Sequence, residues 1–179
     1  MSLWVVVSGG LCMAALGRVA WIDHRRFEIS FAALATGLAT GLAAIVLVEG
    51  YAGLVASVIG GAIISLSFAI VWWVKPKSIG EGDFWLFGAM GLLAGVEWML
   101  PFILLLLVLV LPSAAIWSLM RGKRLFASMF PAAPPAVAAL LPVFVARLVI
   151  TPPTNWANLF TYWIGNGWTG NGWAYTALS

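Results

Sequence analysis

Two aspartates are the residues of this sequence best suited to chemistry. Asp23 lies in the segment IDHRRFEIS and Asp83 in SIGEGDFWLFGAMGLLAG, and the chain has no other aspartate. Two carboxylates held a few ångströms apart cannot both ionise, so they share a proton and act as general base and general acid on a water that attacks an amide. The residue types therefore predict aspartic-protease chemistry if the fold brings the two side chains together.

Two glycines precede the second aspartate, and they suggest a shaped turn. Gly80 and Gly82 of GEGD permit backbone conformations that are barred to other residues, so we expect them to let a substrate strand approach Asp83 closely.

Both aspartates also have a structural interpretation. Asp23 would neutralise the basic residues that follow it, and Asp83 would cap a helix that begins at Phe84. Spacing alone leaves both interpretations open.

The amino-acid composition indicates that these aspartates belong to a membrane protein. Of 179 residues, 63% are hydrophobic and 8% are charged, against roughly 25% charged in an ordinary soluble domain. A helix needs about 20 apolar residues to cross a bilayer. Continuous apolar runs predict an all-α, polytopic membrane protein and exclude an outer-membrane barrel. About six transmembrane helices are expected, at about Leu3–Trp21, Phe31–Val48, Leu54–Val74, Phe84–Val96, Leu100–Met120 and Pro134–Ile150.

The basic residues predict how the chain is oriented in the membrane. With six spans, all but Arg147 fall on one side, which the positive-inside rule makes cytoplasmic. These residues are Arg18, Arg25, Arg26, Lys75, Lys77, Arg121, Lys123 and Arg124. Asp23 and Asp83 then lie together at the cytoplasmic face, and both chain termini are extracytoplasmic. The net charge of +3 is explained by topology, and no nucleic-acid partner is expected.

The chain divides into a transmembrane domain, residues 1–150, and a tail, residues 151–179, rich in Trp, Asn and Gly. Tryptophan and tyrosine favour the headgroup level, so the tail is expected to lie on the outer membrane surface against lipid, or else to bind a partner. The first span is no removable signal peptide, because its arginines follow it. The single Cys12 excludes an intramolecular disulfide and a cysteine-based zinc site.

The two motifs resemble the signature regions of the type IV prepilin peptidases, membrane aspartic proteases that process pilin-like precursors. In that family the first motif reads roughly D-x-R-x-x-x-I-P-N and the second G-x-G-D-x-K-L, each with one catalytic aspartate. The matching residues are Asp23, Arg25 and Ile29 in the first motif, and Gly80, Gly82, Asp83 and Leu86 in the second. The segment MFPAAPPAVAAL also resembles the family's proline-bearing start of the final span, so the resemblance covers about residues 5–150.

The departures from the family pattern concern specificity. Ser30 and Phe31 stand where the family usually has Pro and Asn, and Trp85 stands where it usually has Lys. The chain also lacks the cysteine-bearing amino-terminal region of bifunctional members. It therefore resembles the short, peptidase-only branch found in tight-adherence and conjugative pilus systems.

The resemblance implies a function and a set of roles. Asp23 and Asp83 would be catalytic, and Gly80, Gly82, Arg25 and Trp85 would shape the site. The substrate would be a pilin-like precursor of the bacterial inner membrane, cut at the cytoplasmic boundary behind its short basic leader. Glu28 and Glu81 would attract that leader, or would simply be solvated beside their basic neighbours. No metal or cofactor is implied, and the oligomeric state is not predicted.

Two other classes of protein fit parts of the pattern. A non-catalytic scaffold of a pilus or secretion assembly would explain the altered residues Ser30, Phe31 and Trp85, although a decayed enzyme should also have lost an aspartate. A small proton-coupled transporter would place its acids nearer the middle of the membrane and often in internal repeats, which the sequence does not show.

Overall fold

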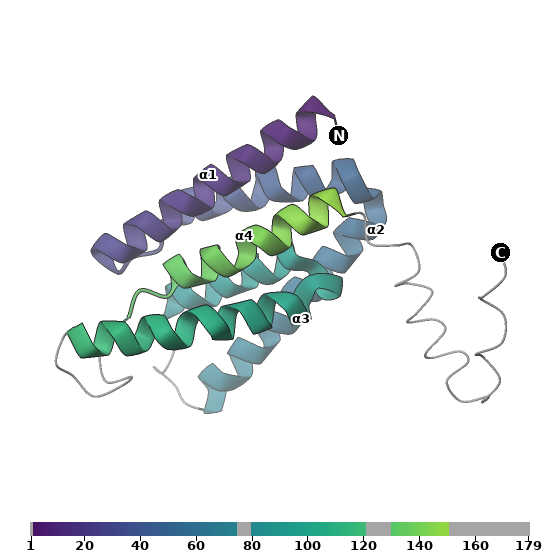
Figure 1. Ribbon diagram of the computed structural model, residues 1–179. Helices are drawn as coiled ribbons and strands as arrows, with labels where there is room; N and C mark the ends of the chain where they lie inside the picture. The colour runs from purple at the N-terminus through teal and green to yellow at the C-terminus, as the bar shows by residue number, and fades with distance from the viewer. Residues whose placement is uncertain (1, 75–79, 121–129, 151–179) are drawn as a thin grey trace, which may run out of the picture. The chain divides into compact units, whose positions relative to one another are not determined.

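The structure is a computed structural model that describes residues 2–74, 80–120 and 130–150. The chain divides into two units, Met1–Val149 and Ile150–Ser179, and the predicted aromatic tail, 151–179, lies outside the described residues. The described part of the first unit is all-helical, as predicted. Its helices are α1 (Leu3–Arg26), α2 (Phe31–Val74), α3 (Glu81–Met120) and α4 (Ala133–Val149) (Figure 1).

A glycine interrupts each of the two longest helices. Gly50 in α2 has φ 67° and ψ −151°, and Gly95 in α3 has φ 71° and ψ 165°. This backbone conformation is essentially restricted to glycine. Figure 1 shows α2 and α3 each folding back on itself at the interruption. Each helix therefore supplies two arms, residues 31–49 and 51–74 in α2 and residues 81–94 and 96–120 in α3.

The lengths and composition of the helices suit a membrane. α1, α2 and α3 are long and apolar enough to cross one, and α4 is a shorter apolar helix. The four arms of α2 and α3, together with α1 and α4, correspond to the six apolar runs of the sequence. Six membrane crossings remain a prediction.

The first arm of α3 contains an almost continuously buried stretch. All but one of the residues from Leu86 to Gly95 are buried. This arm packs closely against the second arm of α2 through glycines, because a Cβ at Gly60 would lie 2.6 Å from the Gly91 carbonyl oxygen. Small residues allow such close approach of helices in membranes. The arm that carries Asp83 is therefore packed between the other helices.

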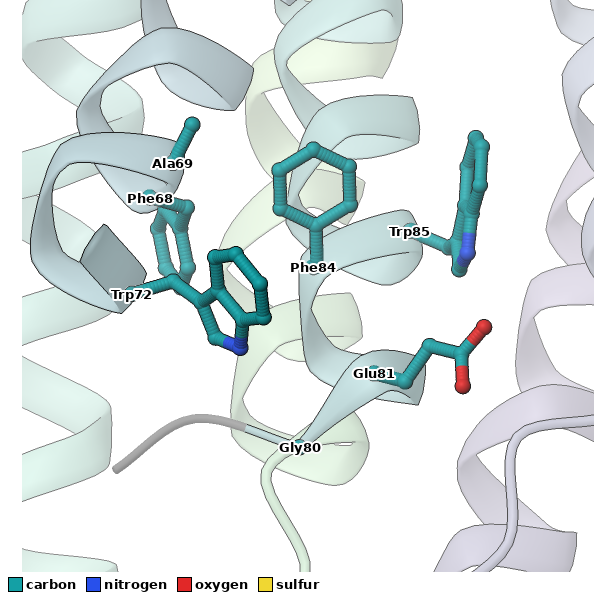
Figure 2. A pocket seen from close by; sticks show the side chains of 7 residues that line it. All are labelled: Phe68, Ala69, Trp72, Gly80, Glu81, Phe84 and Trp85. Carbon is teal, nitrogen blue, oxygen red and sulfur yellow. The ribbon is translucent and has the colours of Figure 1, made fainter. Parts of the chain in front are cut away.

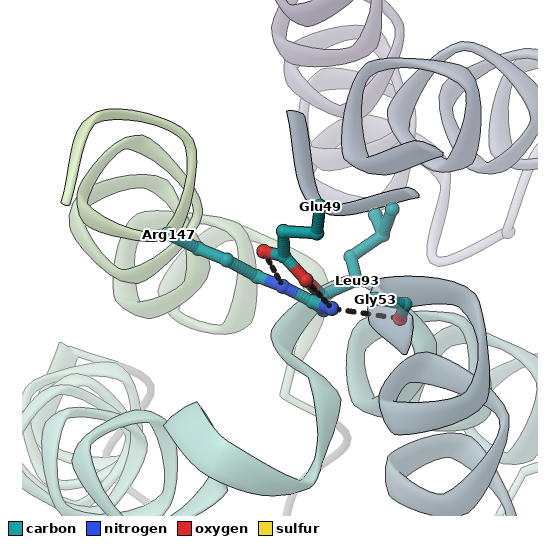
Figure 3. Close-up of polar contacts among 4 residues, drawn as sticks. All are labelled: Glu49, Gly53, Leu93 and Arg147. Atoms are coloured by element: carbon teal, nitrogen blue, oxygen red, sulfur yellow. Dashed lines mark hydrogen bonds and ion pairs between the residues drawn. The ribbon is translucent and has the colours of Figure 1, made fainter. Parts of the chain in front are cut away.

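A buried ion pair joins the far ends of these helices. Arg147 of α4 is fully buried, and its Nε and Nη2 each donate to a carboxylate oxygen of Glu49 at 2.8 Å (Figure 3). Its Nη1 donates to the Leu93 carbonyl and its Nη2 to the Gly53 carbonyl, each at 3.0 Å. Arg147 therefore ties α4 to both glycine interruptions. The sequence predicted only that Arg147 lies opposite the other basic residues, and not that it has this partner.

Candidate active site

Asp23 lies in the last turn of α1 and is buried, with 6% of its surface exposed. Its Oδ2 accepts a hydrogen bond of 2.8 Å from the backbone N–H of Ala133, the first residue of α4. The first N–H groups of a helix have no partner within the helix, and they form its positive end. The start of α4 therefore supplies one favourable contact for the buried Asp23 carboxylate.

The turn after α1 is short and keeps its residues beside Asp23. Phe27 ends α1 in a left-handed conformation, φ 56° and ψ 36°, and its N–H donates to the Asp23 carbonyl at 2.8 Å. Ser30 then begins α2, since its Oγ accepts from the Ala33 N–H at 3.4 Å and its carbonyl accepts from Leu34. Ser30 thus acts as the N-cap of α2. This is a structural reason for serine at a position where the resembled motif has proline.

Asp83 is the third residue of α3, and its carboxylate accepts a hydrogen bond from the backbone N–H of Gly80. The structural interpretation of Asp83 was wrong about where the helix starts. The helix begins at Glu81, because the Gly80 carbonyl already accepts the Phe84 N–H at 3.2 Å and closes the first turn. Asp83 instead reaches back from inside that turn, as an acidic side chain does in a capping box.

The conformational reason predicted for the two glycines does not apply to Gly82. Gly82 lies inside α3, and its φ is not positive. Space is the constraint at Gly82, where a Cβ would lie 2.8 Å from Ile29 Cγ1. A Cβ at Gly80 would lie 3.3 Å from Asp83 Oδ2, a tight contact with the end of a side chain. Gly82 therefore lets the start of α3 pack against the turn that follows Asp23.

The two aspartates, which come from different helices, line one pocket. Its volume is about 490 Å³, and the two carboxylates are close enough to repel each other electrostatically. The described residues that line it include four acidic and no basic side chains. They are Asp23, Phe27, Glu28, Ile29, Phe31, Gly80, Glu81, Gly82 and Asp83. The fold thus brings both predicted catalytic residues together with Glu28, Glu81, Gly80 and Gly82.

An apolar pocket of about 450 Å³ adjoins the acidic one and shares Gly80 and Glu81 with it. Figure 2 shows its aromatic walls, with the ring of Phe84 between those of Trp72 and Trp85. Trp85 lines this apolar pocket and is absent from the lining of the acidic one. The acidic pocket therefore has an aromatic neighbour along the start of α3.

Arg25, which was predicted to shape the site, and His24, which follows Asp23 in the sequence, make aromatic contacts outside the acidic pocket. The guanidinium of Arg25 lies over the Trp21 ring, 4.2 Å from its centroid, in a cation–π contact, and Arg25 does not line the acidic pocket. His24 packs edge-on against Trp117 of α3, with 5.9 Å between ring centroids. Neither side chain is placed by the structure for a direct role beside the two carboxylates.

The sequence did not reveal that α4 contributes to the site. The proline-bearing segment around Ala133 was a signal for the start of a helix, because proline is frequent there. Nothing in the sequence indicated which side chain the free N–H would meet, since the partner is Asp23, 110 positions away.

These observations describe an apolar, all-helical protein in which two aspartates from separate helices share an acidic pocket. The chain belongs to the type IV leader peptidase family, whose sequence model matches residues 10–119, more than half of the chain. Membership places it among the peptidases, which are hydrolases. Comparisons with curated proteins and with solved structures found no significant match. The matched region contains both aspartates and ends before α4.

Proposed function

We propose that this protein is an aspartic endopeptidase that removes the short basic leader of pilin-like precursors at the cytoplasmic face of the bacterial inner membrane. The observation that carries the proposal is that Asp23 and Asp83 line one pocket within the region that matches the family. Their separation of 60 positions has no local structural explanation. A pair of neighbouring carboxylates is the arrangement that aspartic-protease chemistry requires.

The proposed chemistry uses the one proton that the pair shares. The ionised aspartate accepts a proton from the attacking water, and the protonated aspartate hydrogen-bonds the scissile carbonyl oxygen. The water oxygen bonds to the carbonyl carbon, and the pair then holds two protons. One of them passes to the leaving nitrogen as the C–N bond breaks and the carbonyl re-forms, and the other remains shared by the pair. Asp23 is buried and Asp83 is half-buried, which strengthens these electrostatic interactions because the effective dielectric constant around the two carboxylates is lower than in water.

The two neighbouring pockets support the choice of substrate. The acidic pocket, with Glu28 and Glu81 beside the aspartates, favours a positively charged leader. The aromatic pocket beside it, with Trp72, Phe84 and Trp85, suits the apolar residues that follow the cut. A basic segment next to an apolar segment is the pattern of a pilin-like precursor.

The test is co-expression of the full chain with a precursor that has a lysine-rich leader, a glycine and an apolar segment. Asp23→Asn and Asp83→Asn keep the size of the side chain but remove the carboxylate. Each should lower processing by about a thousandfold or more, since each removes an essential member of the pair. The shift in precursor size on a gel measures processing, at membrane levels matched to the wild type.

Glu97→Gln is the matched control, because Glu97 is an exposed acid of α3 that does not line the acidic pocket. It should process the precursor at the wild-type rate. Wild-type processing by either asparagine variant would refute the aspartic assignment and favour a non-catalytic scaffold of a pilus or secretion assembly.

A further inference from the structure

The start of α4 contacts Asp23 although α4 lies outside the region that matches the family. The match ends at residue 119, and α4 begins at Ala133. The hydrogen bond from the Ala133 N–H to Asp23 Oδ2 is 2.8 Å long and buried. Ala133 itself has no exposed surface, so water cannot replace this donor.

The sequence at the start of α4 leaves this N–H as a single donor. Pro134 and Pro135, which follow Ala133, have no backbone N–H. The next N–H, that of Ala136, already donates to the Ala132 carbonyl at 3.2 Å. The first turn of α4 therefore offers one free donor, from Ala133 to Asp23.

We propose that the Ala133 backbone N–H is a positioning group of the active site, which fixes one oxygen of the Asp23 carboxylate and supports its ionised form. Oδ1 is then the oxygen left to share the proton and to contact the attacking water. This inference rests on the proposed function and extends the catalytic unit to α4, beyond the matched region.

The charges around Asp23 must be considered for any effect of pH. His24 is its neighbour on α1, Glu28 lies in the turn, and Glu81 and Asp83 come from the start of α3. The single charged residues of α2 and α4, Glu49 and Arg147, form the ion pair near the glycine interruptions. At Asp23, α4 therefore contributes this hydrogen bond and the dipole of its backbone, but no side-chain charge.

The sharpest variant replaces Ala133 by lactic acid through in vitro translation, so that an ester oxygen replaces the N–H and the side chain is unchanged. A133P, made genetically, also removes the N–H, and proline is tolerated at the first position of a helix. A133G is the matched control because it retains the N–H. All are assayed as full chains in lipid nanodiscs with the lysine-leader precursor described above.

The ester and A133P should lower kcat by about ten- to a hundredfold, the effect expected from losing one hydrogen bond to a charged group. KM should not change, because the N–H does not touch the substrate. The acidic limb of the pH–rate profile should move to higher pH, since the ionised form of Asp23 loses a stabilising donor. A133G retains the N–H, so it should lower kcat much less than the ester and should leave the position of the acidic limb unchanged. An ester variant with the wild-type kcat and pH profile would overturn the inference.

Hydrogen exchange supplies a second measurement that does not depend on activity. A peptide across the start of α4 reports few amides, because two of its residues are prolines. The Ala133 amide should exchange slowly in the wild type and faster in Asp23→Ala. If the Ala133 amide exchanges at the same rate in the wild type and in Asp23→Ala, this inference is overturned and the proposed function is not. If the Ala133 amide does exchange faster in Asp23→Ala but the wild type does not process the precursor, the proposed function is overturned, and with it the positioning role of the Ala133 N–H.

Discussion

At the scale of residues, the site depends on where two carboxylates are held. Asp23 is held by the Ala133 N–H and Asp83 by the Gly80 N–H, so each carboxylate accepts a backbone donor at a helix start. Glycine at 82 is explained by space, because a side chain there would meet Ile29. The geometry of the pair is thus set mainly by backbone groups and close packing.

The pair should behave as a single unit in kinetics. Asp23→Asn with Asp83→Asn should cost no more than either change alone, because residues that act together are not additive. The rate should depend on pH as a bell: at low pH both carboxylates are protonated and no base remains, and at high pH both are ionised and no acid remains.

The bell-shaped pH dependence is tested by initial rates of the wild type on the lysine-leader precursor, measured across the pH range. The single and double asparagine variants, at matched protein levels, test the coupling. A double variant whose loss equals the product of the two single losses would show that the aspartates act independently.

At the scale of elements, the glycine interruptions and the Arg147 ion pair determine how the arms meet. Gly50 and Gly95 reverse the chain, and Arg147 binds beside both through Glu49, Gly53 and Leu93. A Cβ at Gly95 would lie 2.5 Å from Arg147 Nη1, so this position excludes a side chain by space as well as by backbone conformation. The buried arm of α3 thus has Asp83 near one end and this ion pair near the other.

Breaking the ion pair on one side should destabilise the fold. Arg147→Met leaves Glu49 buried without a partner, and such a loss costs about 3–5 kcal/mol. Lysine should not rescue it, because a single ammonium cannot reproduce the two parallel hydrogen bonds to Glu49. Thermal unfolding in detergent, compared with the wild type, measures the effect.

The paired change, Arg147→Met with Glu49→Leu, serves as the control. Removing both charges leaves none uncompensated, so much of the lost stability should return. An Arg147→Met variant that unfolds at the wild-type temperature would mean that the ion pair contributes little to holding the arms together.

At the scale of the whole molecule, the helices reverse at Gly50 and Gly95, while Asp23 and the starts of α3 and α4 lie together away from those reversals (Figure 1). Most basic residues of the sequence lie in the last turn of α1 or in the segments that follow α2 and α3. If these segments are cytoplasmic, so is the acidic pocket, as the proposed substrate requires.

Accessibility of single cysteines tests this orientation. Cysteines at Ser78 and Gly122 should be shielded from an impermeant thiol reagent in intact cells, and one at Gly170 should be labelled. These positions lie outside the described residues, and the expectation comes from charge alone. The native Cys12 is buried, so the unmodified chain is the unlabelled control. Labelling at Ser78 from outside would place the site on the wrong side for a cytoplasmic leader.

The sequence by itself determined the helical class, the family motifs and the two aspartates, because hydrophobic composition and residue type are local properties. It also located the six apolar runs, since a helix that crosses a membrane must satisfy its backbone internally. The closeness of Asp23 to Asp83 followed only conditionally, from an assumed number of spans.

The tertiary structure decided which groups meet across the chain. The Ala133 N–H on Asp23 and the Glu49 partner of Arg147 join residues 110 and 98 positions apart, and no local pattern encodes such contacts. It also replaced a conformational reason for Gly82 by a steric one, because the atoms that exclude a side chain there belong to the distant Ile29. Packing between helices depends on the shapes of both partners, and a single stretch of sequence contains only one of them.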